Sequence, residues 1–156
     1  MTQPNFVAGY IVAAKEKEEP LYLLLRRSQK SCLPGIWQIV TGKLNPNENA
    51  AQAVQREILE ETSLVCLEIY NVDVSMFYEQ SKKRIAFSAN FCAFANHLSS
   101  INLSKTEHDE YRWCTFSEAY SLLAFPSQKE TLAFIHKHYV LQKPHSVNVL
   151  QIETVR

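Results

Sequence analysis

Three glutamates near the end of one predicted helix constrain the fold of this chain more than any other feature. Residues from about 48 to 62 have helical periodicity, and Glu57, Glu60 and Glu61 lie three and four residues apart within them. Like charges at this spacing destabilise a helix by roughly a few tenths of a kcal/mol per pair, and the negative C-terminal end of the helix dipole adds to the repulsion. The glutamates alone would also fit a solvated acidic face. A divalent cation removes the conflict, because hard cations such as Mg²⁺ favour carboxylate oxygens.

The residues around these glutamates follow a specific spacing. A glycine is followed after five residues by a glutamate, and after seven more by Arg-Glu, an aliphatic residue, any residue and Glu-Glu. The matching positions are, in order, Gly42, Glu48, Arg56, Glu57, Ile58, Glu60, Glu61 and Leu64. Agreement at so many positions is not expected by chance, and the segment resembles the Nudix box, the signature of the Nudix hydrolase family. The metal-binding interpretation of the glutamates is therefore favoured over the solvated face.

Two positions depart from the usual box. Ser63 stands where the box has glycine, and Val40-Thr41 replace the Pro-Gly that usually precedes it. Glycine suits a helix end because the left-handed conformation costs it little. Ser63 must either adopt that conformation at some cost or end the helix differently, whereas the ligands are unaffected.

The resemblance implies a fold and a set of roles for the box. The expected fold is α/β (α+β), a Nudix-type α/β/α sandwich with a mixed sheet. Glu57, Glu60 and Glu61 would bind Mg²⁺, with Mn²⁺ as an alternative, and Glu57 would also serve catalysis. Arg56 would support catalysis by holding the carboxylates. The two motif residues are structural in this interpretation: Gly42 would let the loop approach the helix, and Glu48 would reach towards Arg56 or the metal, or simply suit the helix N-terminus.

A further acid is expected from a distant loop, as a metal ligand or general base. The family usually recruits one, and Thr106-Glu107-His108 favours Glu107 for both roles. Asp109 and Glu110 are alternatives, and a solvated acidic loop would explain all three. His108 lies in the same polar loop, where a histidine is usually a surface residue.

Basic and aromatic residues supply candidate substrate contacts. Alternation along a strand points Arg26 and Arg27 to opposite faces, so one of them can meet phosphate. Arg27 and Lys43 are the predicted phosphate contacts. The predicted stacking surface for a base or pterin comprises Trp37 and Phe77, with Phe87 as a third candidate that its regular alternation favours as a core residue.

The rest of the chain predicts a strand-rich single domain. Strands are expected at residues 5–14, 21–27, 36–41, 85–95 and 111–116, one or two strands at 64–79, and helices at 117–125 and 127–139. The alternation in 85–95 predicts a strand with one clearly apolar face. Residues 1–140 are expected to form one Nudix domain, and residues 141–156 a tail or an edge strand.

Composition restricts the partners and the compartment. The 156 residues include 16 basic and 16 acidic side chains, so no net positive field attracts nucleic acid, and Lys82-Lys83-Arg84 is the only compact basic cluster. RNA and membrane are therefore disfavoured as partners, since the longest apolar run, residues 6–14, is too short to span a bilayer. Four cysteines without a CxxC pair are typical of reduced thiols, which predicts a cytoplasmic protein. The expected state is a monomer or homodimer.

The resemblance implies an enzyme that hydrolyses a diphosphate linkage in a nucleoside or pterin triphosphate. Short matches at Trp37-Gln38, Val40-Thr41-Gly42, Thr106-Glu107-His108, Tyr111 and Trp113 look like the bacterial dATP and dihydroneopterin triphosphate pyrophosphohydrolases. Bound Mg²⁺ would neutralise phosphate charge and lower the pKa of the attacking water. The alternatives are a catalytically silent nucleotide-sensing module and a hydrolase of dinucleoside polyphosphates or RNA 5′ ends.

Overall fold

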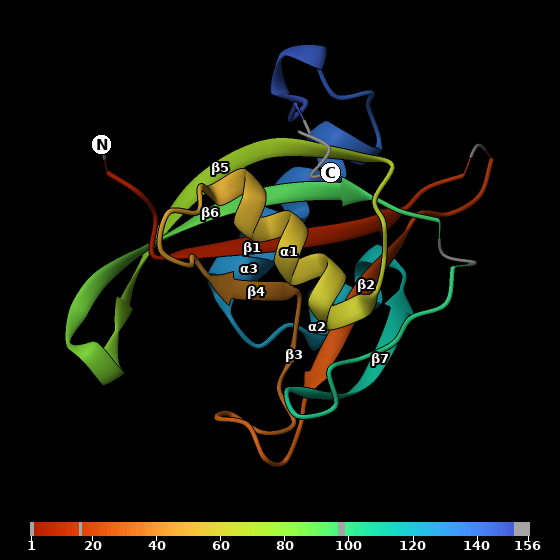
Figure 1. Ribbon diagram of the computed structural model, residues 1–156. Coiled ribbons are helices and arrows are strands. Elements are labelled where there is room, and N and C mark those ends of the chain that lie inside the picture. Colours follow the sequence, from red (N-terminus) through yellow and green to blue (C-terminus); the bar gives the residue numbers. More distant parts are fainter. Residues whose placement is uncertain (1, 16, 97–98, 152–156) are drawn as a thin grey trace.

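A mixed β-sheet lies between one helix on its first face and two helices on its second face (Figure 1). The computed structural model describes residues 2–15, 17–96 and 99–151. The strands are β1 (Phe6–Ala13), β2 (Leu21–Arg27), β3 (Trp37–Gln38), β4 (Val40–Lys43), β5 (Glu68–Glu79), β6 (Arg84–Phe94) and β7 (His108–Cys114). The α-helices are α1 (Ala50–Thr62), α2 (Phe116–Leu122) and α3 (Pro126–Ile135). The predicted fold class is confirmed.

Alternating residues of the central strands build a core on each face of the sheet. Val7 and Ile11 of β1 pack in a cluster with Val54 and Ile58 of α1. Their neighbours Ala8, Tyr10 and Val12 belong to the opposite cluster, which contains the buried residues of α2 and α3. Because both faces are covered, the central strands are apolar throughout rather than on alternate residues.

The two central strands β1 and β2 separate soon after they meet. They pair in antiparallel fashion only at Val12–Tyr22 and Ala13–Leu21. Beyond that point β4 pairs with β1 and β3 pairs with β2, whereas β7 pairs with β2 all the way from Tyr22 to Arg27. We call the opening between β1–β4 and β2–β3–β7 the fork. It explains why the single strand predicted at 36–41 is two strands: β3 and β4 belong to opposite sides of it.

Capping side chains set the bounds of α1. Asn49 is the N-cap, and its side chain accepts a hydrogen bond from the Gln52 amide while the Gln52 side chain accepts one from the Asn49 amide. The helix therefore begins at Ala50, two residues later than predicted. It ends at Ser63, whose φ of 62° and ψ of 13° are left-handed. Ser63 thus adopts the left-handed conformation, which glycine would adopt at less cost, and the helix does not end in a different way.

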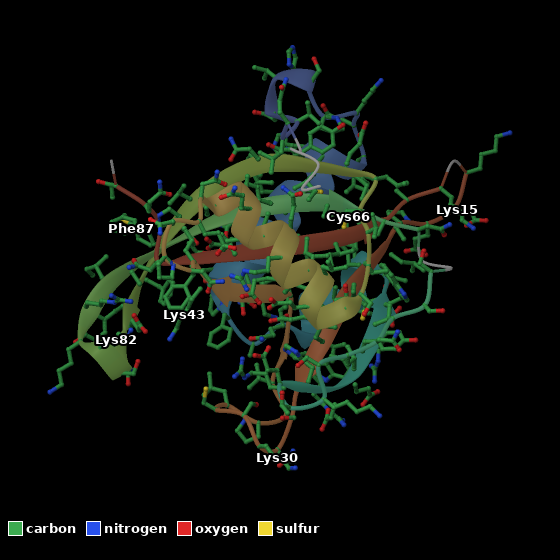
Figure 2. The ribbon with its side chains drawn as sticks, in the orientation of Figure 1. Lys15, Lys30, Lys43, Cys66, Lys82 and Phe87 are labelled. Atoms are coloured by element: carbon green, nitrogen blue, oxygen red, sulfur yellow. The ribbon has the colours of Figure 1, made fainter. Side chains whose placement is uncertain are left out.

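The alternation in residues 85–95 does not separate a buried face from an exposed one. Ala86, Ser88 and Asn90 are buried, because β6 lies between β1, its parallel neighbour, and β5, and both of its faces are covered. At the hairpin end the apolar side chains are exposed instead: Phe87, which alternation favoured as a core residue, is 37% exposed (Figure 2).

The C-terminal segment adds to the far edge of the sheet. Val149 forms an antiparallel bridge with Tyr70 of β5, and the Leu150 amide donates to the carbonyl of Ile69. The domain boundary at residue 140 stays a prediction. Among the described residues, no helix is both long and apolar enough to cross a bilayer.

Candidate active site

Strand β4 comes into direct contact with a glutamate of the box. Gly42 of β4 lies against the side chain of Glu57, and a Cβ placed on Gly42 would be 2.1 Å from Glu57 Cδ. No larger residue fits there unless the carboxylate moves. The glycine thus serves close approach between β4 and α1 rather than an unusual backbone conformation.

Arg56 connects the acids of the box. Its Nε donates to Glu48 Oε1 at 2.7 Å and its Nη2 to Glu48 Oε2 at 3.0 Å. Its Nη1 reaches Glu57 Oε1 at 2.7 Å and Glu60 Oε2 at 3.2 Å. The Nη2 group also donates to the carbonyl of Lys43 at 2.9 Å, which ties the helix to β4. The hydrogen bond from Arg56 lowers the pKa of Glu48, so this pair remains charged.

Glu61 is the most unusual carboxyl group of the site. It is only 3% exposed, and its Oε2 has no hydrogen-bond partner among the described residues. Burial above all, and then the charges of Glu57 and Glu107, raise the pKa of Glu61 to about 10. A buried carboxyl group without a donor is costly, and a cation is the partner that would make its charged form favourable. This donor set therefore fits a divalent metal.

A loop residue and the first residue of β7 complete the acidic cluster. One ligand atom each of Glu61, Glu107 and His108 lie within 4.8 Å of one another, a spacing that could hold a metal ion. The Glu107 loop is fixed by its backbone: its carbonyl accepts from the Ser28 amide at 2.8 Å, and its amide donates to the carbonyl of Ser104 at 2.9 Å. Glu107 and Glu61 thus face each other from opposite sides of the fork.

The two alternative loop acids have other partners. Asp109 Oδ1 accepts from Arg26 Nε at 2.8 Å, and Glu110 Oε2 lies 2.9 Å from Arg26 Nη1. Both carboxylates are therefore occupied by Arg26. Among the acids of this loop, Glu107 alone belongs to the cluster with Glu61.

His108 is not the surface residue that its polar loop predicted. It is 1% exposed, because β7 begins at His108 and pairs with Arg27 of β2 beside the fork. Its Nε2 lies 3.2 Å from Nε2 of the buried Gln38, and its Nδ1 has no hydrogen-bond partner among the described residues. Sequence reasoning missed this placement, because no local signal reveals where a short strand begins.

The residues predicted to contact substrate lie in different surroundings. The Arg27 guanidinium hydrogen-bonds the carbonyl and the sulfur of Cys32, so the following loop holds it. The ammonium of Lys43 is exposed beside the box (Figure 2). The Trp37 ring is contacted by the guanidinium groups of Arg26 and Arg112, whose Cζ atoms lie 5.9 and 4.9 Å from its centre.

A cavity of about 430 Å³ opens between the sheet and the start of α3. Phe77 lines it and lies 5.6 Å from the Phe6 ring, whereas Trp37 is not part of the lining. Gln38 also lines the cavity and contacts His108, so the cavity adjoins the acidic cluster. Its polar lining includes Asn90 and Gln128, and the Oε1 of Gln128 is buried without a partner among the described residues. The volume and the mixed lining suit one aromatic ring system.

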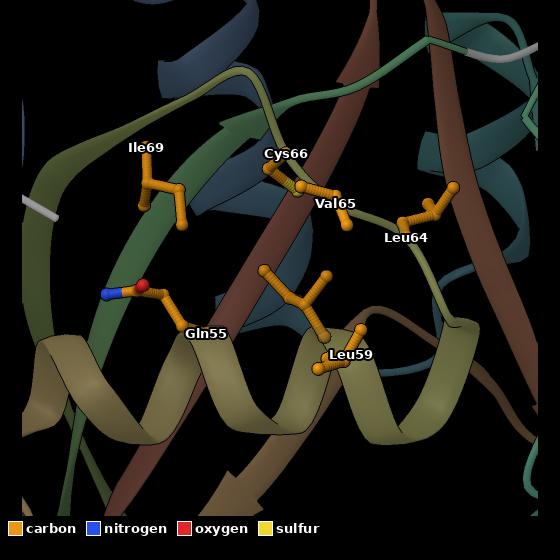
Figure 3. A pocket seen from close by; sticks show the side chains of 7 residues that line it. Gln55, Leu59, Leu64, Val65, Cys66 and Ile69 are labelled. Carbon is orange, nitrogen blue, oxygen red and sulfur yellow. The ribbon is translucent and has the colours of Figure 1, made fainter. Parts of the chain in front are cut away.

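A second, apolar hollow lies on the other face of α1, away from the acids. Figure 3 shows it between the helix and the segment that leads to β5. It measures about 180 Å³ and is lined by Gln55, Ile58, Leu59, Leu64, Val65, Cys66 and Ile69. Burial raises the pKa of the Cys66 thiol to about 11, so this cysteine is a poor nucleophile at neutral pH. The hollow has no charged lining and does not serve the chemistry of the acidic cluster.

Fold and site together define the class of the protein. It is a mixed α/β domain in which helix α1 contributes the buried Glu61 to a cluster with Glu107 and His108 that could hold a metal ion. The NUDIX domain family matches residues 4–137, and the chain belongs to that family, as its box predicted.

The chain is also similar to proteins with stated activities. It is 28% identical over 125 residues to an octanoyltransferase of Myxococcus xanthus, a match that covers 78% of this chain and 34% of that protein. The chain therefore spans about a third of this curated relative. Two solved structures share the fold. A C. elegans Ap4A hydrolase has a TM-score of 0.69 at 21% identity, covering 85% of this chain and 96% of that one. The E. coli dihydroneopterin triphosphate pyrophosphohydrolase has a TM-score of 0.67 at 23% identity, covering 90% and 99%.

Proposed function

We propose that this protein is a Mg²⁺-dependent hydrolase that cleaves a diphosphate linkage in a nucleoside or pterin triphosphate. The observation that carries the proposal is the buried, unpartnered carboxylate oxygen of Glu61, which lies beside Glu107 and next to a ring-sized cavity. An acid of a purely solvated helix face would instead be exposed to water. The similarity of the fold to a dihydroneopterin triphosphate pyrophosphohydrolase supports the same substrate class.

Each acid has a proposed role in holding the metal. Glu57, Glu60, Glu61 and Glu107 would bind Mg²⁺, or Mn²⁺ in its place. The ion, when bound, would neutralise charge on the phosphates and lower the pKa of water. Glu57 or Glu107 would accept the proton of the attacking water. Arg56 would act as a positioning residue, because its guanidinium fixes Glu57 and Glu60 at once.

The proposed substrate lies across the fork. Its phosphates would lie at the acids, where the exposed ammonium of Lys43 and the guanidinium of Arg27 are the proposed contacts. Its ring would enter the cavity against Phe77, with Gln38 between ring and metal cluster. The stacking role predicted for Trp37 has no comparable support, because that ring contacts Arg26 and Arg112 instead.

The cytoplasm is the proposed compartment. All four cysteines are described, and all are free. Cys92 and Cys114 are buried within the core, where a thiol behaves as a small apolar residue. This supports a reducing environment, in which the protein would act as a monomer or homodimer on a small-molecule substrate.

A substrate panel tests the proposal. The purified protein would be incubated with Mg²⁺ and with dNTPs, dihydroneopterin triphosphate, dinucleoside polyphosphates or ADP-ribose, and pyrophosphate and orthophosphate would be measured separately. We expect pyrophosphate from a triphosphate. Preference for a dinucleoside polyphosphate would favour the activity of the C. elegans structural relative. Tight nucleotide binding without turnover would favour a sensing module.

Two variants separate turnover by this protein from turnover by a contaminating enzyme. Glu57→Gln keeps the size of the side chain but removes its charge, and turnover should fall at least about 100-fold if Glu57 supports deprotonation of water. Glu130→Gln changes an exposed acid on α3 and should leave turnover unchanged. Equal activity of both variants would contradict the proposal.

A further inference from the structure

We propose that His108 is a nitrogen ligand of the metal in this site, so that the site prefers transition-metal dications such as Mn²⁺ or Co²⁺ to Mg²⁺. The inference rests on the proposed function, since it concerns the same metal site, and it deepens it by favouring Mn²⁺, the alternative ion there, over Mg²⁺. Glutamates alone would make an oxygen site. A ring nitrogen beside Glu61 and Glu107 makes a mixed nitrogen and oxygen site.

The first argument is the position of the ring. A ring nitrogen of His108 belongs to a group whose ligand atoms lie within 4.8 Å of one another, together with carboxylate oxygens of Glu61 and Glu107. His108 and Glu61 are 1% and 3% exposed, so water reaches neither side chain freely. The side chains come from α1, the 104–107 loop and β7, which hold them from two sides of the fork.

The second argument is that two residues of this cluster each have a buried polar atom without a partner. His108 Nδ1 and Glu61 Oε2 both have no hydrogen-bond partner among the described residues. A buried donor or acceptor left unsatisfied costs about 1–3 kcal/mol, and more for a charged group. A histidine in a purely structural role would normally be hydrogen-bonded through both nitrogens or exposed. One cation between these atoms would satisfy both.

The third argument concerns the other ring nitrogen. His108 Nε2 lies 3.2 Å from the amide nitrogen of Gln38. For Nδ1 to bind a cation, the ring proton must lie on Nε2, and Gln38 must then present its carbonyl oxygen. Rotation of the amide by half a turn provides this without moving the backbone. Gln38 is therefore a positioning residue, which fixes the tautomer as outer partners of metal-bound histidines do.

The nitrogen ligand has a consequence for selectivity. Mg²⁺ strongly prefers oxygen ligands, whereas imidazole suits later transition metals, whose affinity rises along the series from Mn²⁺ to Cu²⁺. Removal of the imidazole ring should therefore weaken the binding of Mn²⁺ and Co²⁺ more than that of Mg²⁺. Removal of a purely structural histidine would weaken the binding of all three ions alike.

Pulsed electron paramagnetic resonance of the Mn²⁺-loaded full chain tests the ligand directly, without substrate or turnover. We expect modulation from a directly bound ¹⁴N nucleus, replaced by the ¹⁵N pattern when histidine is ¹⁵N-labelled. The modulation should disappear in His108→Ala and persist in His138→Ala, which removes an exposed histidine of the C-terminal segment. Because labelling uses the unmutated protein, the test stands even if His108→Ala fails to fold; His108→Gln then takes its place.

The outcomes separate the two proposals. Stoichiometric Mn²⁺ without nitrogen modulation would overturn the histidine ligand and leave the hydrolase proposal intact. Failure to bind Mn²⁺ or Mg²⁺ at all would overturn both. Affinities measured by calorimetry provide a second readout: His108→Ala should weaken Mn²⁺ at least about tenfold, in the range seen for residues that tune metal sites, and Mg²⁺ distinctly less. An equal loss for both ions would contradict the proposed selectivity.

Discussion

At the scale of single residues, the site depends on a few close contacts. Gly42 is the clearest case, because the Glu57 carboxyl group occupies the space where its Cβ would lie. Glu61 is the opposite case, a buried acid whose charged form would be favoured only with a bound cation. Gly42 matters because it is small, and Glu61 matters because its charge would need a partner.

Gly42→Ala should reduce turnover at least about 100-fold by displacing a catalytic carboxylate. The effect should act through Glu57, since the added methyl group would overlap that side chain. A double-mutant cycle with Glu57→Ala checks this, because Gly42→Ala should cost little further activity in that background. Additive losses in kcat/KM would show that the glycine acts elsewhere.

Glu107→Gln should lower kcat strongly with a smaller change in KM, because in the proposed mechanism the loop acid acts on the metal or the water in the transition state. Asp109→Asn is the matched control, since its carboxylate pairs with Arg26 rather than with the cluster. Steady-state kinetics of both variants decide the assignment. If the Asp109 variant loses more activity than the Glu107 variant, the loop acid is misassigned.

Without metal, Glu61 should make the domain less stable as pH rises. Its folded-state pKa of about 10 lies above the ordinary value of 4.5. Above the ordinary value, the unfolded chain releases this proton while the folded chain keeps it, so the free energy of unfolding falls until the folded pKa is reached. Denaturant titrations in chelator, at several pH values in this window, should show a weaker pH dependence for Glu61→Gln. The same pH dependence of the free energy of unfolding in the unmutated protein and in Glu61→Gln would contradict the raised pKa of Glu61.

At the scale of elements, α1 carries most of the proposed metal ligands, and its two ends are capped in different ways. Its start has a complete capping box, whereas its end places Ser63 in a left-handed conformation that a residue with a side chain adopts at some cost. The serine side chain approaches the carbonyl of Asn102 at 3.5 Å, which is a weak compensation. The C-terminal end of α1, next to Glu60 and Glu61, is therefore the end at which a substitution can stabilise the helix.

Ser63→Gly should raise the free energy of unfolding by about 0.5–1 kcal/mol, because glycine tolerates positive φ. The matched control is Ala51→Gly within the same helix, which should lower it by about 1 kcal/mol through backbone entropy. Both variants gain the same flexibility in the unfolded chain, so opposite signs isolate the left-handed cap. Equal destabilisation in urea titrations would show that Ser63 carries no conformational cost.

The sequence predicts α1, its glutamates and most strands because these depend on local periodicity and on the spacing of the box. It does not predict the fork, since the parting of β1 and β2 depends on which distant strands pair with each. The burial of His108 has the same origin: β7 starts earlier than the expected residue 111 because it extends along β2. Likewise, the partners of Asp109 and Glu110 emerge only when β7 lies beside Arg26.

At the scale of the whole molecule, metal binding and folding should be linked. The acids come from segments far apart in the chain, so the unfolded protein does not contain the site. Anything that binds only the folded state stabilises it by mass action, by about 2.7 kcal/mol at a concentration of 100 times Kd.

Mg²⁺ should therefore raise the Tm of the domain, and a non-hydrolysable triphosphate analogue should raise it further. The gain should shrink strongly in Glu57→Gln and persist in Glu130→Gln, which changes an acid outside the site. Scanning calorimetry with and without chelator measures both. An unchanged Tm at saturating Mg²⁺ plus analogue would contradict a metal site in the folded domain.

The fork gives a bound cation a mechanical role as well as a chemical one. The two arms of the sheet share only two residue pairs before they part, so few backbone hydrogen bonds connect them directly there. An ion held by Glu61 on one side and by Glu107 on the other would act as a reversible cross-link across the opening. Like a disulfide, it would close a long chain loop, but it would do so only while the ion is bound, so that the rigidity of the sheet would follow the supply of metal.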